Sequence, residues 1–199
     1  MIYSIFDITD LFGNTENMYN SLPKAERELT DIIKDEKDKD RHICSLALLS
    51  VLFNLKEYKE RDSGEIISEK VTEIEMKPMP EIFRNKSGKP CFQNGKPNFS
   101  ISHSKNAVMV AISESAVGVD IEMRREDMET DRINRRFFGE ENRDFFRLWT
   151  EKEALAKMTG EGLAKALKAV VDYEKIKILH GEFVDKEGNK YEFCVAKER

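Results

Sequence analysis

Residues 99–122 read FSISHSKNAVMVAISESAVGVDIE and contain three segments that each predict a β-strand. Polar and apolar residues alternate over Phe99–His103, which is the pattern of a strand with one buried face. Residues 107–112 form a continuous apolar run, and alternation returns over Val117–Glu122. The middle of the chain is therefore predicted to contain three consecutive strands.

The last of these strands carries two carboxylates on one face. Because side chains alternate along a strand, Asp120 and Glu122 project to one side beside Gly118, and the apolar residues project to the other. Two carboxylates two residues apart can reach a common cation, and Mg²⁺ prefers oxygen ligands. The alternative is an edge strand with a solvated acidic face, and the strand alone does not separate the two interpretations.

Around this centre, the sequence predicts elements in the order β-α-β-β followed by β-α-β-β-β. Ile2–Ile8 has the pattern of a strand, and Pro23–Leu55 is mostly helical in pattern. The elements expected after the central strands are helices over 132–138 and 142–158, a turn into a short helix at 160–163, and strands over 173–179, 181–184 and 191–196. This order is compatible with an α+β fold of two similar lobes.

The chain has 199 residues, of which 40% are hydrophobic and 36% charged, as in ordinary globular domains. Its formal net charge of −5 argues against nucleic-acid binding over the whole surface. No apolar run approaches the roughly 20 residues that a membrane span needs, and the first residues do not resemble a signal peptide. Three widely spaced cysteines indicate neither a disulfide framework nor a zinc site. We therefore expect a cytoplasmic protein that contacts no membrane and no nucleic acid.

The middle of the chain is divided by charge. Residues 84–113 contain five Lys or Arg residues and His103 but no acid, whereas residues 114–131 contain seven acids. A site for a metal–phosphate complex needs both groups, because cations hold phosphate oxygens and carboxylates hold the metal. The alternative is chance clustering on a charge-rich surface.

Glu153, in the segment Trp149–Lys157, is a third candidate carboxylate. Its segment also allows two structural interpretations. Thr150 and Glu153 have the spacing of a capping box at the start of a helix. Glu153 and Lys157 are four residues apart and so could form a surface ion pair on one helix face.

Taken together, these segments resemble the 4′-phosphopantetheinyl transferase superfamily, in its two-lobed type that activates peptide and polyketide synthases. The resemblance is strong over roughly residues 84–165 and weak elsewhere. The matching motifs are Gly88-Lys89-Pro90, Phe99-Ser100-Ile101-Ser102-His103-Ser104, Gly118-Val119-Asp120-Ile121-Glu122, Arg136-Phe137-Phe138 with Glu141, and the run from Trp149-Thr150 through Lys152-Glu153-Ala154, Lys157 and Gly160 to Gly162-Leu163.

The resemblance implies an α+β fold of two similar α/β lobes related by a pseudo-twofold axis, with the active site in the cleft between them. Residues 1–112 would form the N-terminal lobe, which holds the nucleotide end of coenzyme A. Residues 113–199 would form the C-terminal lobe, with the metal site and the catalytic helix. A monomer is implied, because the internal duplication replaces the subunit pairing of shorter relatives.

The resemblance also implies roles for individual residues. Asp120, Glu122 and Glu153 match the magnesium ligands of the family, and Lys157 matches a lysine that contacts the phosphates of coenzyme A. Residues that match contacts of the nucleotide end are Ser102, His103 and Lys89, with a looser match for Lys24, Arg27 and Arg41. The sequence departs from the family at Ser100, where relatives often carry Asn, and at Ser45, where Gly is common.

The implied reaction transfers 4′-phosphopantetheine from coenzyme A to a serine hydroxyl of an acyl, polyketide or peptidyl carrier protein and releases 3′,5′-ADP. The implied metal is Mg²⁺, and Mn²⁺ suits the same oxygen ligands. Glu153 is favoured as the base that accepts the serine proton, with Lys157 adding positive charge at the phosphate. Two rival functions are a magnesium-dependent phosphoesterase, which needs no carrier, and a non-catalytic module that binds coenzyme A or a carrier protein.

Overall fold

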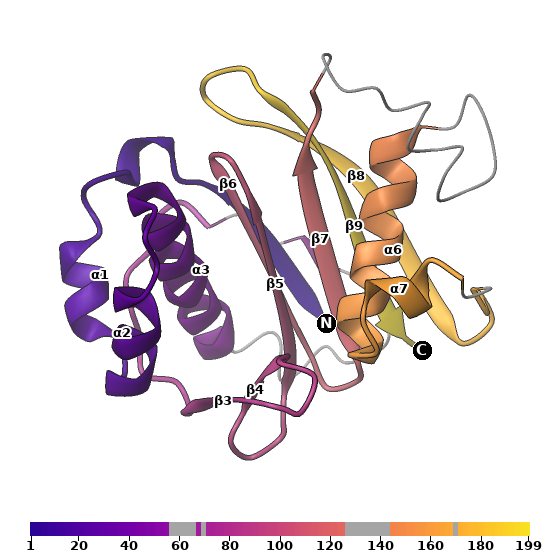
Figure 1. Cartoon of the computed structure of the whole chain (residues 1–199), viewed down its shortest axis with the longest axis horizontal. Coiled ribbons are helices and arrows are strands. Elements are labelled where there is room, and N and C mark those ends of the chain that lie inside the picture. Colours follow the sequence, from indigo (N-terminus) through magenta and orange to yellow (C-terminus); the bar gives the residue numbers. More distant parts are fainter. Residues whose placement is uncertain (56–66, 69–70, 126–143, 169–170) are drawn as a thin grey trace.

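The computed structural model describes residues 1–55, 67–68, 71–125, 144–168 and 171–199, which Figure 1 shows in colour. The chain combines helices with largely antiparallel sheets, so the predicted α+β class is confirmed. The helix expected over 132–138 lies outside the described residues.

The N-terminal half is built on a four-stranded sheet in the order β2-β1-β6-β5. Its strands are β1 (Ile2–Asp7), β2 (Ile67–Ser68), β5 (Asn98–Ser104) and β6 (Ala107–Ser113). The other elements of this half are η1 (Thr9–Leu11), α1 (Glu16–Ser21), α2 (Lys24–Asp31), α3 (Glu36–Asn54) and the small hairpin of β3 (Ile82–Arg84) and β4 (Pro90–Phe92). Helix α3 covers the outer face of the sheet (Figure 1).

The C-terminal half repeats this plan with a three-stranded antiparallel sheet in the order β7-β9-β8. Its elements are β7 (Val117–Met123), α6 (Phe145–Thr159), α7 (Leu163–Ala166), β8 (Ile176–Val184) and β9 (Lys190–Glu198). Helix α6 covers this sheet as α3 covers the first one. The order β1-β6-β5 with α3 therefore has the same connectivity as β7-β9-β8 with α6.

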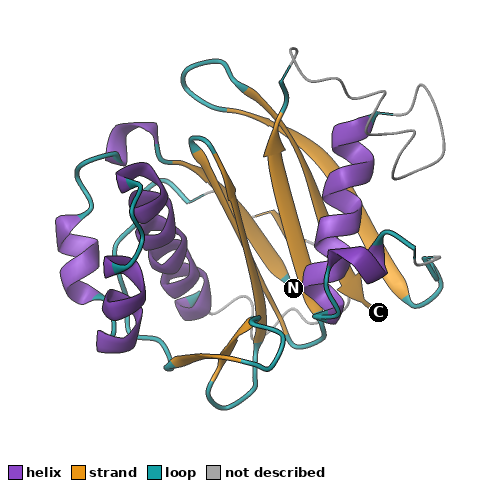
Figure 2. Cartoon of the chain, viewed as in Figure 1, coloured by secondary structure: helices purple, strands orange, loops and turns teal. Residues whose placement is uncertain are grey.

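The two sheets lie between the helices, which Figure 2 shows on both outer sides. Strand β6 explains this layering, because all of its residues are buried and its two faces serve different cores. Val108, Val110 and Ile112 pack in the core under α3. Met109 and Ala111 point the opposite way and pack in a second core with the apolar face of β7.

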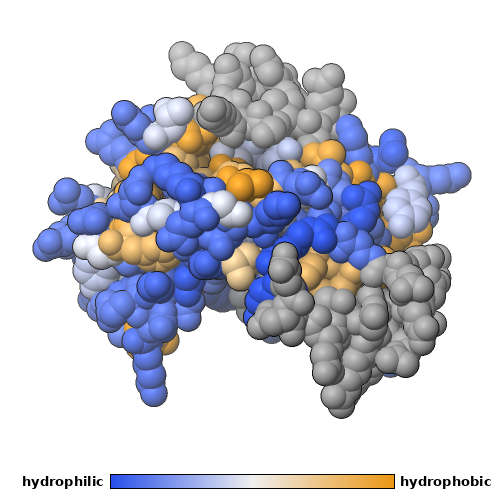
Figure 3. Space-filling view, turned by 90° about the horizontal axis from the view of Figure 1, so that it is seen from above, coloured by the Kyte–Doolittle hydropathy of each residue, from blue (hydrophilic) through white to orange (hydrophobic). Residues whose placement is uncertain are grey.

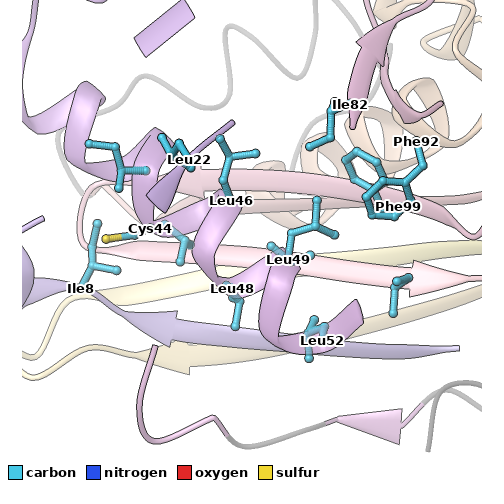
Figure 4. Close-up of a cluster of buried hydrophobic side chains, with 14 of the residues drawn as sticks. Ile8, Leu22, Cys44, Leu46, Leu48, Leu49, Leu52, Ile82, Phe92 and Phe99 are labelled. Carbon is cyan, nitrogen blue, oxygen red and sulfur yellow. The ribbon is translucent and has the colours of Figure 1, made fainter. Parts of the chain in front are cut away.

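Helix α3 begins in the charge-rich segment 34–41 and has its buried part in the first core. Asp35 caps it by accepting a hydrogen bond from the N–H of Asp38 at 2.8 Å. Residues Glu36–Asp38 of the first turn are exposed. Every residue from Ile43 to Leu52 is buried, and Figure 4 shows Leu46, Leu49 and neighbouring side chains filling the space above the sheet.

Strand β8 corrects one prediction. Separate strands were expected over 173–179 and 181–184, but a single strand runs through Gly181. The ring of Phe193 on β9 lies over this glycine, and an added Cβ would be 2.3 Å from its ring edge. The glycine that suggested a break therefore makes room for a cross-strand aromatic ring.

None of the helices in the described ranges is long and apolar enough to cross a membrane. On the face shown in Figure 3, hydrophobic residues reach the surface in small groups separated by hydrophilic ones.

The β8–β9 turn is fixed to the N-terminal half by a buried carboxylate. Asp185 accepts hydrogen bonds from the hydroxyl of Tyr191 at 2.8 Å and from the side-chain amide of Asn106, in the β5–β6 turn, at 3.0 Å. Burial raises the pKa of Asp185, but these bonds and those from Asn189 outweigh it, so the pKa lies below its ordinary value. This network joins the two halves at one end of the sheets.

We predict that Asp185→Asn lowers the free energy of unfolding at pH 7 by about 2 kcal/mol, because charge-assisted hydrogen bonds are lost. For a chain of this size this corresponds to roughly 4–8 °C in the thermal midpoint. A depressed pKa in the folded state stabilises it above the unfolded pKa of about 3.9, and this contribution is lost as the pH falls through the folded pKa. The difference between variant and unaltered protein should therefore shrink below about pH 3.5 in thermal melts. Asp172→Asn, at an exposed ion pair with Lys175, is the control and should change little.

Candidate active site

Gly118 allows α6 to lie directly on β7. A Cβ added at this glycine would be 1.9 Å from the carbonyl oxygen of Ala154 and 2.4 Å from the amide nitrogen of Met158. The opposite face of β7 is held in the core between the sheets. The alternation predicted that Asp120 and Gly118 share one face of β7. Because β7 contacts α6 at Gly118, the side chain of Asp120 points at the same helix.

Helix α6 begins earlier than the capping-box interpretation required. Asp144 is its N-cap and accepts hydrogen bonds from the N–H groups of Phe146 and Arg147 at 3.1 and 3.4 Å. Thr150 lies buried inside the helix, so the interpretation of Thr150 and Glu153 as a capping box is wrong. Glu153 is therefore available to face the space between α6 and the strands.

Arg124 fixes the start of α6 to the sheet, and sequence reasoning did not find this role. Its guanidinium donates to Asp144 Oδ2 at 2.5 Å and to Glu192 Oε2, on β9, at 2.6 Å. The available signal was a basic residue directly after a strand and an acid directly before an aromatic helix. The contact fixes α6 relative to β7 at a second point, beyond Gly118.

A pocket of about 260 Å³ lies between β5, β7 and α6, and we call it the carboxylate pocket. Six polar residues line it: Ser102, His103, Asp120, Glu122, Glu153 and Lys157. All six are residues to which the sequence assigned a role at the site. A second pocket of about 310 Å³ shares Glu153 and Lys157 with it and continues along α6 between the β3–β4 turn and Leu163. We call this one the adjoining pocket.

Asp120 is the most buried of the three carboxylates, with 3% of its surface exposed. Its Oδ1 accepts hydrogen bonds from Lys157 Nζ at 2.7 Å and from Ser102 Oγ at 2.8 Å. Its Oδ2 is buried and has no hydrogen-bond partner among the described residues. A buried carboxylate oxygen without a partner is costly, and sites of this kind need a functional explanation.

Glu122 and Glu153 face the same pocket from two different elements. Burial and then the charge of Asp120 raise the pKa of Glu122, and the same two causes in the same order raise that of Glu153. Lys157 opposes both shifts without cancelling them. Each carboxylate is thus disfavoured in its charged form by its surroundings.

These residues fit a divalent cation. A bound cation would be a partner for the buried oxygen of Asp120, which has none among the described residues. It would also favour the charged forms of Glu122 and Glu153, whose pKa values are raised. In the described part of the chain, however, no three His, Cys, Asp or Glu side chains are close enough to hold a metal ion jointly. The donor set therefore suits a hard cation that takes further oxygen ligands from a substrate or from water.

Lys157 pairs with Asp120 and not with Glu153. Its ammonium also donates to Ser102 Oγ at 3.0 Å, and about a third of its side chain is exposed. Glu153 and Lys157 therefore do not form the surface ion pair that their spacing allowed. The side chain of Lys157 lines both pockets and so places a positive charge between them.

His103 lies at the open end of the carboxylate pocket. The surrounding protein and then the charges of Arg41 and Lys157 lower the pKa of His103 to about 4, so it is neutral near pH 7. Arg41 reaches this end from α3 and donates to the backbone carbonyl of Lys105 at 2.9 Å. Arg41, which the sequence matched only loosely, thus lies near His103, with its guanidinium also paired with Asp38 at 2.5 Å.

The other predicted nucleotide contacts are not in the carboxylate pocket. The ammonium of Lys89 lies in the adjoining pocket and donates to the backbone carbonyls of Met158 and Val117 at 3.2 and 3.3 Å, and burial lowers its pKa. Lys24 is largely exposed and pairs with Glu28. Arg27 donates to the carbonyl of Asn20. Phosphate contacts by these three basic residues stay predictions.

Comparison with known proteins shows that part of this chain resembles one family. The sequence model of the 4′-phosphopantetheinyl transferase superfamily matches residues 116–182, which contain β7, α6 and most of β8. The resemblance to phosphopantetheinyl transferases is confirmed. Four of the candidate metal and phosphate residues lie inside this match: Asp120 and Glu122 on β7, and Glu153 and Lys157 on α6.

Several curated phosphopantetheinyl transferases are similar to parts of this chain. The chain is 32% identical to the 4′-phosphopantetheinyl transferase AcpT of Salmonella typhi, over 43% of this chain and 52% of that protein. It is 38% identical to the 4′-phosphopantetheinyl transferase gsp of Aneurinibacillus migulanus, over 41% of this chain and 39% of that protein. It is 33% identical to the 4′-phosphopantetheinyl transferase HetI of Nostoc sp., over 34% of each chain. The chain thus spans about half or less of the length of these relatives.

Proposed function

We propose that this protein transfers 4′-phosphopantetheine from coenzyme A to a serine hydroxyl of a carrier protein in a Mg²⁺-dependent reaction that releases 3′,5′-ADP. The observation that carries the proposal is the buried, unpartnered oxygen of Asp120 in a pocket shared with Glu122, Glu153 and Lys157. The family match over residues 116–182 supports it, because these four residues lie within the matched segment.

In the proposed site, Asp120, Glu122 and Glu153 would supply the protein ligands of the cation, which would have to draw these side chains closer together than they lie among the described residues. Mn²⁺ would suit the same ligands. When bound, the cation supplies charge neutralisation at the pyrophosphate of coenzyme A, which is the main requirement of phosphoryl transfer. Lys157 lies between the two pockets and would bind the phosphate oxygens from the other side. We expect His103 and Arg41 to contact the nucleotide phosphates at the open end of the carboxylate pocket.

The chain's own residues must also handle a proton. The serine hydroxyl of the carrier attacks phosphorus, the bond to the leaving 3′,5′-ADP breaks, and the hydroxyl proton passes to a base. We assign this base to Glu153, because α6 places its side chain in both pockets, where the carboxylate pocket meets the adjoining pocket.

Glu153→Gln is expected to lower kcat by about 10²-fold or more even at saturating Mg²⁺, because general-base catalysis typically contributes this much. Turnover and Mg²⁺ dependence are measured by mass spectrometry of the carrier. Glu161→Gln, which removes a carboxylate just after α6 outside both pockets, is the matched control. A Glu153→Gln protein with normal Mg²⁺ affinity and normal turnover would remove Glu153 as the base.

The proposal as a whole is tested by the intact mass of a purified apo carrier protein after incubation with this protein, coenzyme A and Mg²⁺. A gain of one phosphopantetheine arm that disappears with chelator supports transfer. Cleavage of coenzyme A without modification of fatty-acid, polyketide or peptide carriers would indicate the phosphoesterase. Binding of coenzyme A with no reaction would indicate the binding module.

We extend the proposal to the molecule as a whole. The repeated connectivity of β1-β6-β5 with α3 and β7-β9-β8 with α6 supports two lobes, 1–112 and 113–199, related by a pseudo-twofold axis. The carboxylate pocket between β5 of one half and β7 of the other supports a site in the cleft between them. We propose that this unit acts as a cytoplasmic monomer, which sedimentation of the purified protein would test.

A further inference from the structure

Strand β5 carries serines at three alternate positions, Ser100, Ser102 and Ser104, so that all three lie on one face. These three serines join the two halves of the molecule. Ser100 Oγ accepts from the N–H of Val119 at 3.0 Å, and Ser104 Oγ accepts from that of Met123 at 3.1 Å. Ser102 makes the middle bond of the series, at 3.4 Å. Each bond joins residues nineteen apart, so β5 and β7 run side by side in the same direction.

The hydroxyl of Ser102 is fully used. A serine hydroxyl donates one hydrogen bond and accepts two. Ser102 donates to Asp120 Oδ1 at 2.8 Å and accepts from Lys157 at 3.0 Å and from the N–H of Ile121. It therefore cannot donate to a phosphate oxygen unless its hydrogen bond to Asp120 breaks. The resemblance instead implied a contact with the nucleotide end of coenzyme A.

Ser104 repeats this arrangement at the second carboxylate. It donates to Glu122 Oε2 at 3.1 Å while it accepts from the N–H of Met123. Ser100 makes the backbone bond alone and has no carboxylate hydrogen-bond partner in the described part of the chain. The two serines that lie next to acidic residues of β7 thus each hold one carboxylate oxygen, and the third serves only to join the strands.

We propose that Ser102 and Ser104 are positioning residues that orient Asp120 and Glu122 for a divalent cation. This inference rests on the proposed function, because it assumes that these carboxylates hold the metal. Each serine holds one oxygen of its carboxylate and leaves the other to a cation. At the first position this other oxygen is Oδ2 of Asp120, which has no hydrogen-bond partner among the described residues. Carboxylate ligands are commonly oriented in this way by hydrogen bonds from outside the metal site. The serines also make the orientation depend on the contact between the two halves.

The test compares Ser104→Ala with Ser100→Ala, which removes the equivalent backbone bond without touching a carboxylate. Mn²⁺ binding in the presence of coenzyme A is measured by the electron paramagnetic resonance signal of free Mn²⁺. We expect Ser104→Ala to raise the Mn²⁺ dissociation constant about 10-fold, the lower end of the effect of losing such a hydrogen bond to a ligand. Ser100→Ala should leave it unchanged, and thermal melts should show similar losses of stability for both. Ser104→Thr, which keeps the hydroxyl, should restore binding.

Equal Mn²⁺ affinity in Ser104→Ala and Ser100→Ala would overturn the inference while leaving the proposed function intact. If Ser104→Ala does not fold, Ser104→Thr and Ser104→Val form an equivalent pair of the same shape with and without the hydroxyl, and equal affinities again overturn the inference. Absence of Mn²⁺ binding by the unaltered protein with coenzyme A would overturn the proposed metal site and, with it, this inference.

Discussion

Asp120→Asn is expected to reduce carrier modification by about 10³-fold or more. The substitution keeps the shape of the side chain but removes the charge of the most buried carboxylate in the pocket. If Asp120 holds a cation at the pyrophosphate, the variant loses several kcal/mol of charge stabilisation in the transition state, and each 1.4 kcal/mol is about tenfold in rate. The measurement is kcat/KM by mass spectrometry of the carrier over a range of Mg²⁺ concentrations.

The stability of the same variant should change much less than its activity. Asp120 raises the pKa values of Glu122 and Glu153, so removing its charge relieves repulsion in the folded state. Lys157 loses its partner but is about a third exposed, so its ammonium can be hydrated. We expect the free energy of unfolding to stay within about 1 kcal/mol, or roughly 2–4 °C in the thermal midpoint.

A matched control separates the charge at the pocket from charge in general. Asp31→Asn removes an exposed carboxylate on α2 that accepts from Tyr19 and should leave turnover unchanged. Normal turnover of Asp120→Asn at every Mg²⁺ concentration would contradict the metal site. Equal losses in both variants would show that net charge, and not the pocket, governs the reaction.

Much of the C-terminal half could be predicted because its local patterns are strong. Alternation over Val117–Glu122 correctly placed Asp120 and Glu122 on one face and the apolar residues in a core. In the N-terminal half, the helical pattern over Pro23–Leu55 correctly predicted α2 and α3. In these segments one dominant period agrees with the tertiary structure, so local sequence is sufficient.

The remaining features depend on contacts between distant segments. The bonds from Ser102 and Ser104 to β7 join positions eighteen or nineteen residues apart on strands of different sheets. The period of two in the serines was visible, but their partners were not. In the same way, Thr150 and Glu153 satisfied a local capping pattern, and only the position of Asp144 at the true start of α6 ruled it out. Local patterns indicate which faces are polar, whereas the structure shows what those faces meet.

The relation between Gly118 and α6 leads to the second large prediction. Gly118→Ala is expected to destabilise the protein by about 3 kcal/mol, at the upper end of the cost of overpacking. This corresponds to roughly 6–12 °C in the thermal midpoint. The added Cβ would meet the backbone of Ala154 and Met158, and backbone atoms of a helix cannot move aside as a side-chain end can. Helix α6 must therefore shift away from β7.

That shift would separate the carboxylates of β7 from Glu153 and Lys157, which are carried by α6. A displacement of about 1 Å typically costs 10²-fold in rate when reacting groups must be aligned, so we expect a loss of this size at temperatures where the variant is folded. Gly181→Ala is the matched control, because its Cβ would meet the end of the Phe193 side chain and not the backbone of a helix. We expect it to lower the thermal midpoint less and to leave kcat near normal. Equal effects of both variants would show that the fit of α6 against β7 has no special role, whereas a selective loss in Gly118→Ala would show that the site depends on the absence of a side chain at this contact.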